Sequence, residues 1–173
     1  MSGYFLDTSA VAKLSHEEDG SQDVERLLTP REPNTIISRL SLVELESVLA
    51  IKIRTGELDA EGRELARRRL VADVAQGRIR VGPPIDERHC RKARDLLARY
   101  GVQRGLRTLD ATQLAVTLGL QEGGVVSVFV AAEGAAVPVA EDCDFSTVDP
   151  SEIGTGLTVP GVESSSSGFD DQR

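Results

Sequence analysis

Short apolar runs alternate along this chain with stretches in which apolar residues recur every three or four positions. The runs have the length and composition of strands, and they lie at 4–6, 35–38, 79–85 and 125–130. The stretches between them show the spacing of one face of an amphipathic helix. Strands that alternate with helices predict a parallel sheet with helices packed on both faces. We therefore expect an α/β fold, a three-layer α/β/α sandwich with a central, mainly parallel sheet.

Residues that commonly start or stop helices bound the predicted helical stretches. Ser41, followed three residues later by Glu44, has the spacing of a capping box at a helix start. Gly119 is expected to stop the helix that begins near Leu109. Together these signals predict helices within 10–14, 22–28, 41–56, 59–76, 86–101, 109–118 and 135–143, and a small edge strand within 146–150.

A chain of 173 residues with 40% apolar residues can bury one core, which predicts a single domain over residues 1–155. Residues 156–173 are rich in serine and acidic side chains, a composition typical of a flexible tail. No apolar run approaches the roughly 18 residues that span a bilayer, so we expect a soluble, cytoplasmic protein. Cys90 and Cys143 lie far apart in the sequence, which argues against a disulfide framework and a zinc site.

The net charge of -8 argues against a protein that holds nucleic acid through a broadly basic surface. It does not exclude a nuclease. Carboxylates that converge on divalent cations make such a chain acidic, while the metal supplies the positive charge that faces a phosphate.

A carboxylate follows the first predicted strand directly. Asp7 ends the apolar run 4–6 and stands at the carboxyl end of that strand, the edge at which open α/β sheets bind ligands. A local explanation competes, because Asp7, Thr8 or Ser9 could simply cap the following helix. Both interpretations stay open on this stretch alone.

Three more acidic residues are predicted to reach the same edge. Glu44 shares a helical face with Val48 and Ile51, although a capping box with Ser41 would also explain it. Asp110 lies in a helix that looks buried, where a carboxylate needs a partner such as a cation. Glu133 follows the strand at 125–130. Oxygen ligands of this kind suit Mg²⁺ or Mn²⁺.

Other motifs add little. The chain has no Walker A sequence and no G-x-G-x-x-G, which disfavours nucleotide hydrolysis or dinucleotide binding by the usual loops. We expect His16 and His89 to be ordinary solvated residues. The arginines at 67–69 are expected to form a solvated helix face paired with Glu61 and Glu64, and only secondarily an RNA contact.

Three segments occur in a characteristic order: residues 5–9, the Ser41-x-x-Glu44 helix start, and residues 106–115. With them, the chain resembles a PIN-domain protein of the VapC-type toxin ribonucleases. The resemblance covers about residues 3–150. It implies a PIN-like α/β/α sandwich and a magnesium-dependent endoribonuclease, often directed at tRNA or rRNA. It also implies a homodimer that is held inactive by a small antitoxin protein.

The resemblance assigns roles to individual residues. The family's metal-binding carboxylates match Asp7, Glu44 and Asp110, and its small hydroxyl residue near the metal matches Ser9. These four residues are the expected catalytic set, and Glu133 is the expected fourth metal ligand. The chain departs from the family there, with Val-Ala-Ala-Glu at 130–133 in place of Val-Thr-x-Asp. Gln113 stands where relatives often carry histidine, which we treat as a lesser departure.

Two functions from different classes therefore compete. The first is a metal-dependent ribonuclease toxin, and the second is a catalytically silent PIN-like module that binds RNA or a protein partner. Glu133 keeps the second hypothesis open. A phospho-acceptor receiver domain also gathers carboxylates at strand ends, but it would require a lysine after a late strand, and none follows Val130.

Overall fold

A five-stranded parallel sheet forms the centre of the protein, which we describe from a computed structural model over residues 3–15, 17–28, 34–132 and 134–151. The strands are β1 (Tyr4–Leu6), β2 (Thr35–Ile37), β3 (Arg80–Val81), β4 (Val128–Val130) and β5 (Ser146–Val148). Their order in the sheet is β3-β2-β1-β4-β5, and every neighbouring pair is parallel. The predicted α/β fold is confirmed. We expected a mainly parallel sheet, and the sheet is entirely parallel over the described strands.

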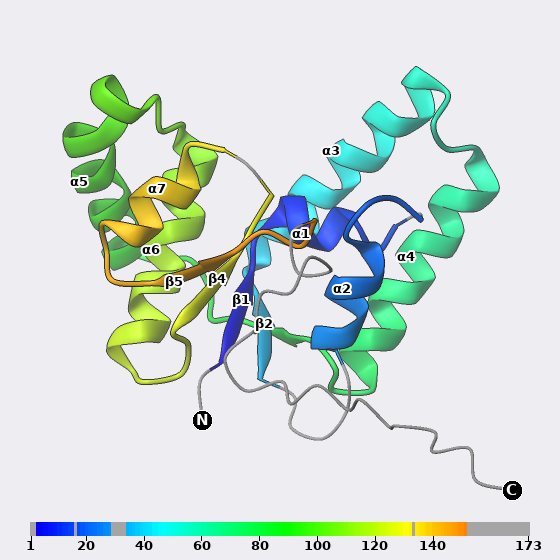
Figure 1. The fold of residues 1–173 in the computed structure, drawn as a ribbon, viewed down its shortest axis with the longest axis horizontal. Helices are drawn as coiled ribbons and strands as arrows, with labels where there is room; N and C mark the ends of the chain where they lie inside the picture. The colour runs from blue at the N-terminus through cyan, green and yellow to red at the C-terminus, as the bar shows by residue number, and fades with distance from the viewer. Residues whose placement is uncertain (1–2, 16, 29–33, 133, 152–173) are drawn as a thin grey trace, which may run out of the picture.

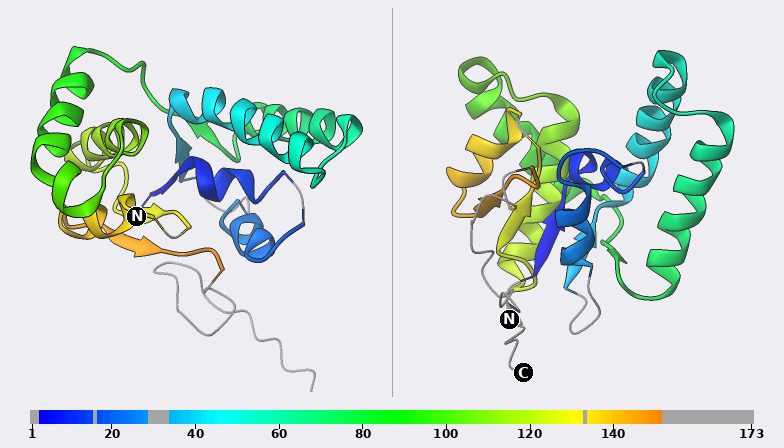
Figure 2. Two further views of the ribbon diagram at one scale, coloured as in Figure 1. Left: turned by 90° about the horizontal axis from the view of Figure 1, so that it is seen from above. Right: turned by 45° about the vertical axis from the view of Figure 1, so that its right-hand side comes forward.

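Helices cover both faces of this sheet. They are α1 (Thr8–Ala12), α2 (Ser21–Leu27), α3 (Arg39–Thr55), α4 (Ala60–Ala75), α5 (Glu87–Arg104), α6 (Thr108–Glu122) and α7 (Ala136–Glu141). Figure 1 shows α5, α6 and α7 on one side of the strands and α1 to α4 on the other, and the turned views in Figure 2 agree. The described chain is therefore the predicted three-layer sandwich. None of its helices is long and apolar enough to cross a membrane.

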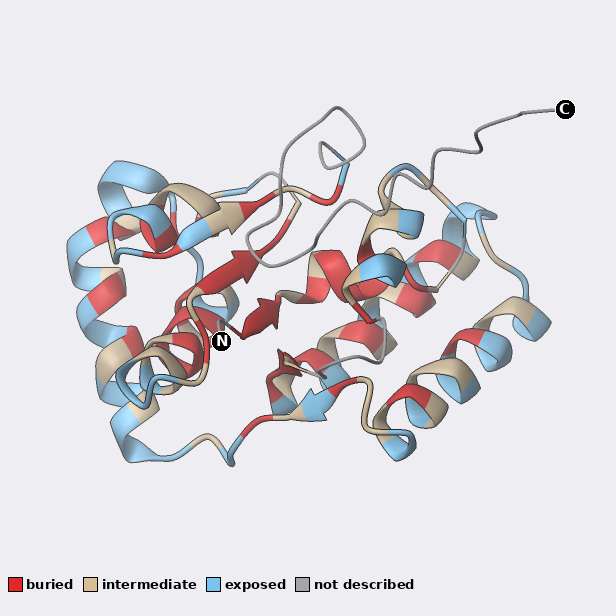
Figure 3. Cartoon of the chain, turned by 60° about the horizontal axis from the view of Figure 1, so that its bottom comes forward, coloured by how far each residue is buried: buried red, intermediate tan, exposed pale blue. Residues whose placement is uncertain are grey.

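The core consists of two apolar clusters, one on each face of the sheet. Because successive strand residues point to opposite faces, Leu6 joins the cluster under α1 to α4, while Phe5 joins the cluster under α5 to α7. Phe5 stacks on Phe129 of β4, with ring centroids 5.9 Å apart. Figure 3 shows the inner strands coloured as buried, in agreement with the full burial of β1, β2 and β4. The alternation fixes β1 in register, and with it the side of the sheet on which the chain continues.

The sheet register sets the position of Asp7. Leu6 pairs with Val130 of β4, and the Asp7 backbone N–H donates to the Val130 carbonyl at 2.9 Å. Asp7 therefore lies at the carboxyl edge of the sheet, at the end of the central strand β1 and beside the end of β4. The chain reaches the amino ends of α1 and α3 from the same edge, as expected for helices that follow parallel strands.

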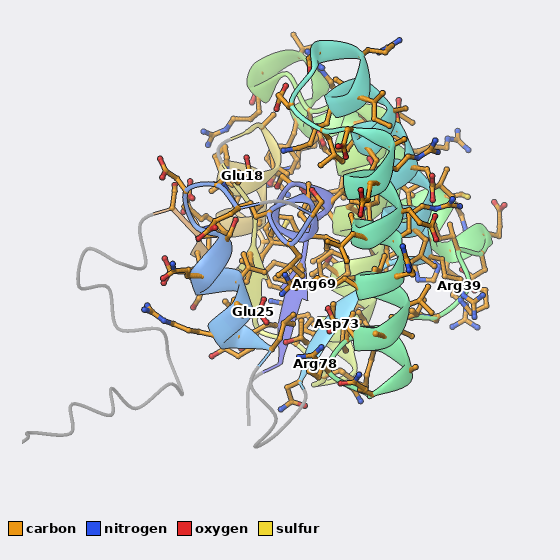
Figure 4. All side chains as sticks on the ribbon, turned by 90° about the vertical axis from the view of Figure 1, so that its right-hand side faces the viewer. Glu18, Glu25, Arg39, Arg69, Asp73 and Arg78 are labelled. Atoms are coloured by element: carbon orange, nitrogen blue, oxygen red, sulfur yellow. The ribbon has the colours of Figure 1, made fainter. Side chains whose placement is uncertain are left out.

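The outer helix α4 is held to the rest of the molecule by ion pairs around a buried carboxylate. The Asp73 side chain is only 1% exposed and faces the guanidinium groups of Arg69 and Arg78. Arg69 also pairs with Glu25 of α2. Figure 4 shows Asp73, Arg69 and Arg78 close together beside α4, with Glu25 on the neighbouring helix α2.

The predicted capping box of Ser41 and Glu44 is wrong. Helix α3 begins at Arg39, and its N-cap is Ser38, whose hydroxyl accepts from the Ser41 backbone N–H at 3.1 Å. Ser38 has the extended backbone that an N-cap requires, because it directly follows β2. Glu44 consequently lies in the second turn of α3, where a capping role no longer explains it.

Two further expectations at helix ends also fail. Helix α6 continues through Gly119 to Glu122, because packing of α6 against α5 outweighs the weak helix propensity of one glycine. His89 is not an ordinary solvated residue: its side chain is 14% exposed and its Nδ1 accepts from the Asp86 backbone N–H at 3.1 Å, completing a capping box. His16 lies outside the described residues.

The basic cluster of α4 is paired, as expected, but mostly with other partners. Arg67 and Arg68 contact Glu64 on their own helix, and Arg67 also reaches Glu46 of α3. Glu61 forms no ion pair among the described residues. These pairs tie α3 and α4 together as an antiparallel arm, and they leave little unpaired positive charge on α4 for RNA.

Candidate active site

Asp7 has both roles that its position in the sequence suggested. It is the N-cap of α1, and its Oδ2 accepts from the backbone N–H of Ser9 at 3.3 Å and from the Ser9 hydroxyl at 2.9 Å. The Ser9 hydroxyl in turn accepts from the Ala132 backbone N–H at 3.1 Å. Ser9 thus orients Asp7 and joins it to the segment that follows β4.

Glu44 reaches the same edge from α3. Its Oε2 accepts from the Thr8 hydroxyl at 2.7 Å and from Nε2 of Gln113 at 2.5 Å. The carboxylate is therefore held by α1 on one side and by α6 on the other. All these hydrogen bonds use one oxygen, which leaves Oε1 for another ligand.

Asp110 comes from the first turn of α6 and is half-buried. Its Oδ2 accepts from the Arg107 backbone N–H at 3.4 Å, closing a local cap at the helix start. A local role thus accounts for part of its placement. Its charge nevertheless acts on the other two carboxylates, because Asp110 raises the pKa of both Asp7 and Glu44.

Burial and mutual repulsion both act on the carboxylates at this edge of the sheet. Burial raises the pKa of Asp7, and hydrogen bonds from Ser9 only partly offset that effect. Burial also raises the pKa of Glu44, with further contributions from the charges of Asp7 and Asp110. None of the three pairs with a lysine or arginine in the described part of the chain. A bound cation would relieve this repulsion.

The donor set fits a hard divalent cation, although it is not a closed cage. Among the residues that the structure describes, no three His, Cys, Asp or Glu side chains are grouped closely enough to surround a metal ion by themselves. Mg²⁺ does not require such a group, because it usually keeps several waters and binds through one or two carboxylates. Asp7, Glu44 and Asp110 suit that mode. The predicted fourth ligand, Glu133, lies outside the described residues.

The sequence did not assign three polar residues beside the carboxylates to the site: Thr8, Ser41 and Gln113. The Gln113 amide contacts all of the others in this group, at 2.9 Å to the Thr8 hydroxyl and 3.0 Å to the Ser41 hydroxyl. A signal was present in the sequence, because Gln113 is an amide on the buried face of α6, one turn after Asp110. The structure gives this departure from the family more weight than the sequence did.

Comparison with known proteins agrees with this geometry. Residues 4–135 match the PIN domain family, which removes the receiver-domain hypothesis. PAE2754 from Pyrobaculum aerophilum has a similar structure, with a TM-score of 0.52, 19% identity, and coverage of 88% of this chain and 92% of that one. VapC20 of Mycobacterium tuberculosis, a toxin that cleaves the sarcin-ricin loop, is also similar, with a TM-score of 0.55 and 21% sequence identity. The match covers 79% of this chain and 95% of VapC20. A search of curated protein sequences found no match. At these identities the structural likeness shows the fold alone.

Proposed function

This chain belongs to the PIN domain family, and we propose that it is a Mg²⁺-dependent endoribonuclease, the toxin of a type II toxin-antitoxin pair. One observation carries the proposal. Asp7, Glu44 and Asp110 arrive from three different elements, and the charge of Asp110 raises the pKa of both Asp7 and Glu44. None of the three pairs with a lysine or arginine among the described residues. Such an arrangement costs stability in the metal-free protein and is suited to binding a divalent ion.

The residues of the site would have two roles: some would bind the ion, and others would hold those ligands in place. Asp7, Glu44 and Asp110 would hold Mg²⁺, or Mn²⁺ in its place. When bound beside a phosphodiester, such an ion lowers the pKa of a water and stabilises the leaving oxygen. Ser9 holds Asp7 through its hydroxyl, and Thr8 holds Glu44. These contacts limit the rotation of both carboxylates.

The substrate and partners follow from the family. VapC20, which has the same fold, cleaves the sarcin-ricin loop, and we propose a structured RNA such as tRNA or rRNA for this chain too. A ribonuclease of that kind acts in the cytoplasm. Its cognate antitoxin would restrain it, and the active form would be a homodimer.

A catalytically silent PIN-like module that binds RNA or a protein remains the second candidate. Two observations favour it: the chain carries Glu133 where the family has aspartate, and the described carboxylates form no closed metal cage. Metal-dependent cleavage separates the two functions, because a silent module would bind RNA without cutting it.

The test is cleavage of total RNA by the purified protein with Mg²⁺, with EDTA, and with an Asp7→Asn variant. We expect cuts only in the parent with Mg²⁺. Asp95→Asn, an exposed aspartate on α5, is the matched control and should cut like the parent. Mg²⁺ or Mn²⁺ should also raise the melting temperature of the parent by binding the folded state. An Asp7→Asn variant that cuts at the parental rate would remove Asp7 from the mechanism.

A further inference from the structure

The side chain of Gln113 occupies a central place in the site. It is 1% exposed and lies on α6 one turn beyond Asp110. Its Nε2 lies 2.5 Å from Glu44 Oε2, 2.9 Å from the Thr8 hydroxyl and 3.0 Å from the Ser41 hydroxyl. One amide thus connects the starts of α1, α3 and α6.

The neighbouring groups fix which way this amide points, and its two N–H hydrogens are shared among three nearby oxygens. The Thr8 hydroxyl donates its only hydrogen to Glu44, so its oxygen is free to accept from the amide. The reverse orientation would place the Gln113 carbonyl oxygen against the Glu44 carboxylate, where neither atom has a hydrogen to share. The nitrogen end of the amide therefore faces the Glu44 carboxyl group.

This orientation leaves the other end of the amide unsatisfied. The Oε1 of Gln113 is buried and has no hydrogen-bond partner among the described residues. A buried acceptor without a partner costs stability, and a leucine of similar size would fill the space without that cost. What distinguishes glutamine from an apolar residue at this position is the set of contacts that Nε2 makes with Glu44, Thr8 and Ser41. Of these three, Glu44 is the candidate metal ligand.

We propose that Gln113 is a positioning residue for the metal site, which locks Oε2 of Glu44 and so presents Oε1 to the ion. The role rests on the proposed metal-dependent function. Thr8 shares the task from the opposite side, and Ser41 steadies the amide through its own contact with Ser38. Gln113 acts only through Glu44 and touches neither substrate nor metal.

The first measurement is the affinity of the metal-free protein for Mn²⁺, by calorimetry. Gln113→Leu should weaken binding by about 10- to 100-fold, the usual loss when a ligand's supporting partner is removed. Gln113→His can present one N–H to Glu44 and should recover part of the affinity. Gln121→Leu is the matched control on the same helix, because its amide donates to the backbone carbonyls of Cys143 and Asp144. It should bind Mn²⁺ like the parent.

A double-mutant cycle distinguishes positioning from general loosening of the site. If Gln113 acts through Glu44, then Gln113→Leu should have no further effect on Mn²⁺ affinity in a Glu44→Gln background. A variant that loosened the whole site would weaken binding by a similar factor in both backgrounds. Additive losses would therefore overturn the positioning role.

The outcomes also separate this inference from the proposed function. If the parent binds Mn²⁺ and Gln113→Leu binds it equally well, the role of Gln113 is wrong while the nuclease proposal stands. If the parent binds Mn²⁺ but never cuts RNA, the nuclease proposal is wrong, and the affinities still decide the role of Gln113. A parent that binds no Mn²⁺ would overturn both.

Discussion

Asp7 shows how one side chain can serve folding and chemistry together. Its carboxylate caps α1 through the Ser9 backbone N–H, and the same group stands at the sheet edge beside Glu44 and Asp110. Asparagine is as good an N-cap as aspartate. An Asp7→Asn substitution should therefore keep the cap while removing the charge, which separates the two roles experimentally.

We predict that Asp7→Asn is more stable than the metal-free parent at neutral pH, and that the advantage shrinks in acid. Because the folded pKa of Asp7 is raised, its contribution to stability is present below the unfolded pKa and is lost as pH rises through the folded value. We expect a gain of about 2–4 °C in melting temperature at pH 7, corresponding to ~1 kcal/mol. Melting curves from pH 4 to 7 in EDTA measure it, and a constant difference would contradict it.

Glu133 carries the charge of the family's aspartate on a side chain one methylene longer. If it is an outer ligand, Glu133→Asp should bind metal at least as tightly and cut no more slowly. Glu133→Ala should lose about 10- to 100-fold in metal affinity yet keep some activity, since Asp7, Glu44 and Asp110 remain. Calorimetry with Mn²⁺ and cleavage rates test both variants.

A Glu133→Ala variant that matches the parent would leave the site with three carboxylates. Asp142 and Asp144 could not replace the fourth, because both precede β5 and so lie at the amino end of a parallel strand. Asp142 is moreover paired with Arg104, at 3.2 Å. These two aspartates therefore serve as controls, and their conversion to asparagine should leave Mn²⁺ affinity unchanged.

At the scale of elements, α4 depends on the buried carboxylate of Asp73. Its partners Arg69 and Arg78 keep partial access to water, with side chains 39% and 31% exposed. Removing the charge by Asp73→Asn should therefore cost about 2 kcal/mol, less than the roughly 3–5 kcal/mol of a fully buried pair. Urea unfolding measures the loss. Glu61→Gln is the control, because Glu61 is exposed and has no ion pair within the part of the chain that the structure describes. Equal stability of the two variants would show that packing alone holds α4.

The start of α3 decides where Glu44 points. With the N-cap at Ser38, Glu44 occupies the sixth position of the helix and turns towards Thr8 and Gln113. Had the helix begun at a Ser41 cap, Glu44 would have bonded back to the backbone and been lost to the site. A shift of three residues in the start of α3, from Ser41 to Ser38, thus changes Glu44 from a capping residue into a candidate metal ligand.

For the whole molecule we predict a homodimer. Apolar side chains are exposed along the arm formed by α3 and α4: Leu42, Val43, Ile51, Leu65 and Val71. Val43 and Leu65 are 68% and 64% exposed, so packing between α3 and α4 does not bury them. Neighbouring exposed apolar side chains of this kind commonly mark a protein–protein interface. Sedimentation velocity should show a dimer that Leu65→Glu weakens. Val102→Glu, at a 98% exposed position on α5, is the control and should not change it.

The segment that follows residue 156 should be dispensable for this association. It is rich in serine and acidic residues and has few apolar ones, so it cannot bury enough surface to hold an interface. A chain truncated after Gly156 should therefore still sediment as a dimer. A truncated chain that sediments as a monomer would overturn both this prediction and the domain limits of 1–155 and 156–173.

Local patterns predicted most of the architecture. The apolar runs at 4–6 and 35–38 became central strands, and the stretch at 59–76 became α4 nearly to the residue. Expectations failed where distant contacts outweighed a local signal, as at Gly119, where packing against α5 carries α6 onward. The approach of Asp7, Glu44 and Asp110 to one edge was predictable, because each follows a strand or lies near the start of a helix in a parallel α/β fold. Their role in binding a metal stays a prediction.

The sequence by itself determined the alternation of strands and helices, the burial of the inner strands and the acidic character of the candidate site, because neighbouring residues set helix periods, strand periods and caps. Only the tertiary structure decided that Thr8, Glu44 and Gln113 share one hydrogen-bonded group. Those residues meet because the strand order places β1 between β2 and β4. That order results from packing between segments more than a hundred residues apart, such as β1 and β4. No local window of the sequence contains it.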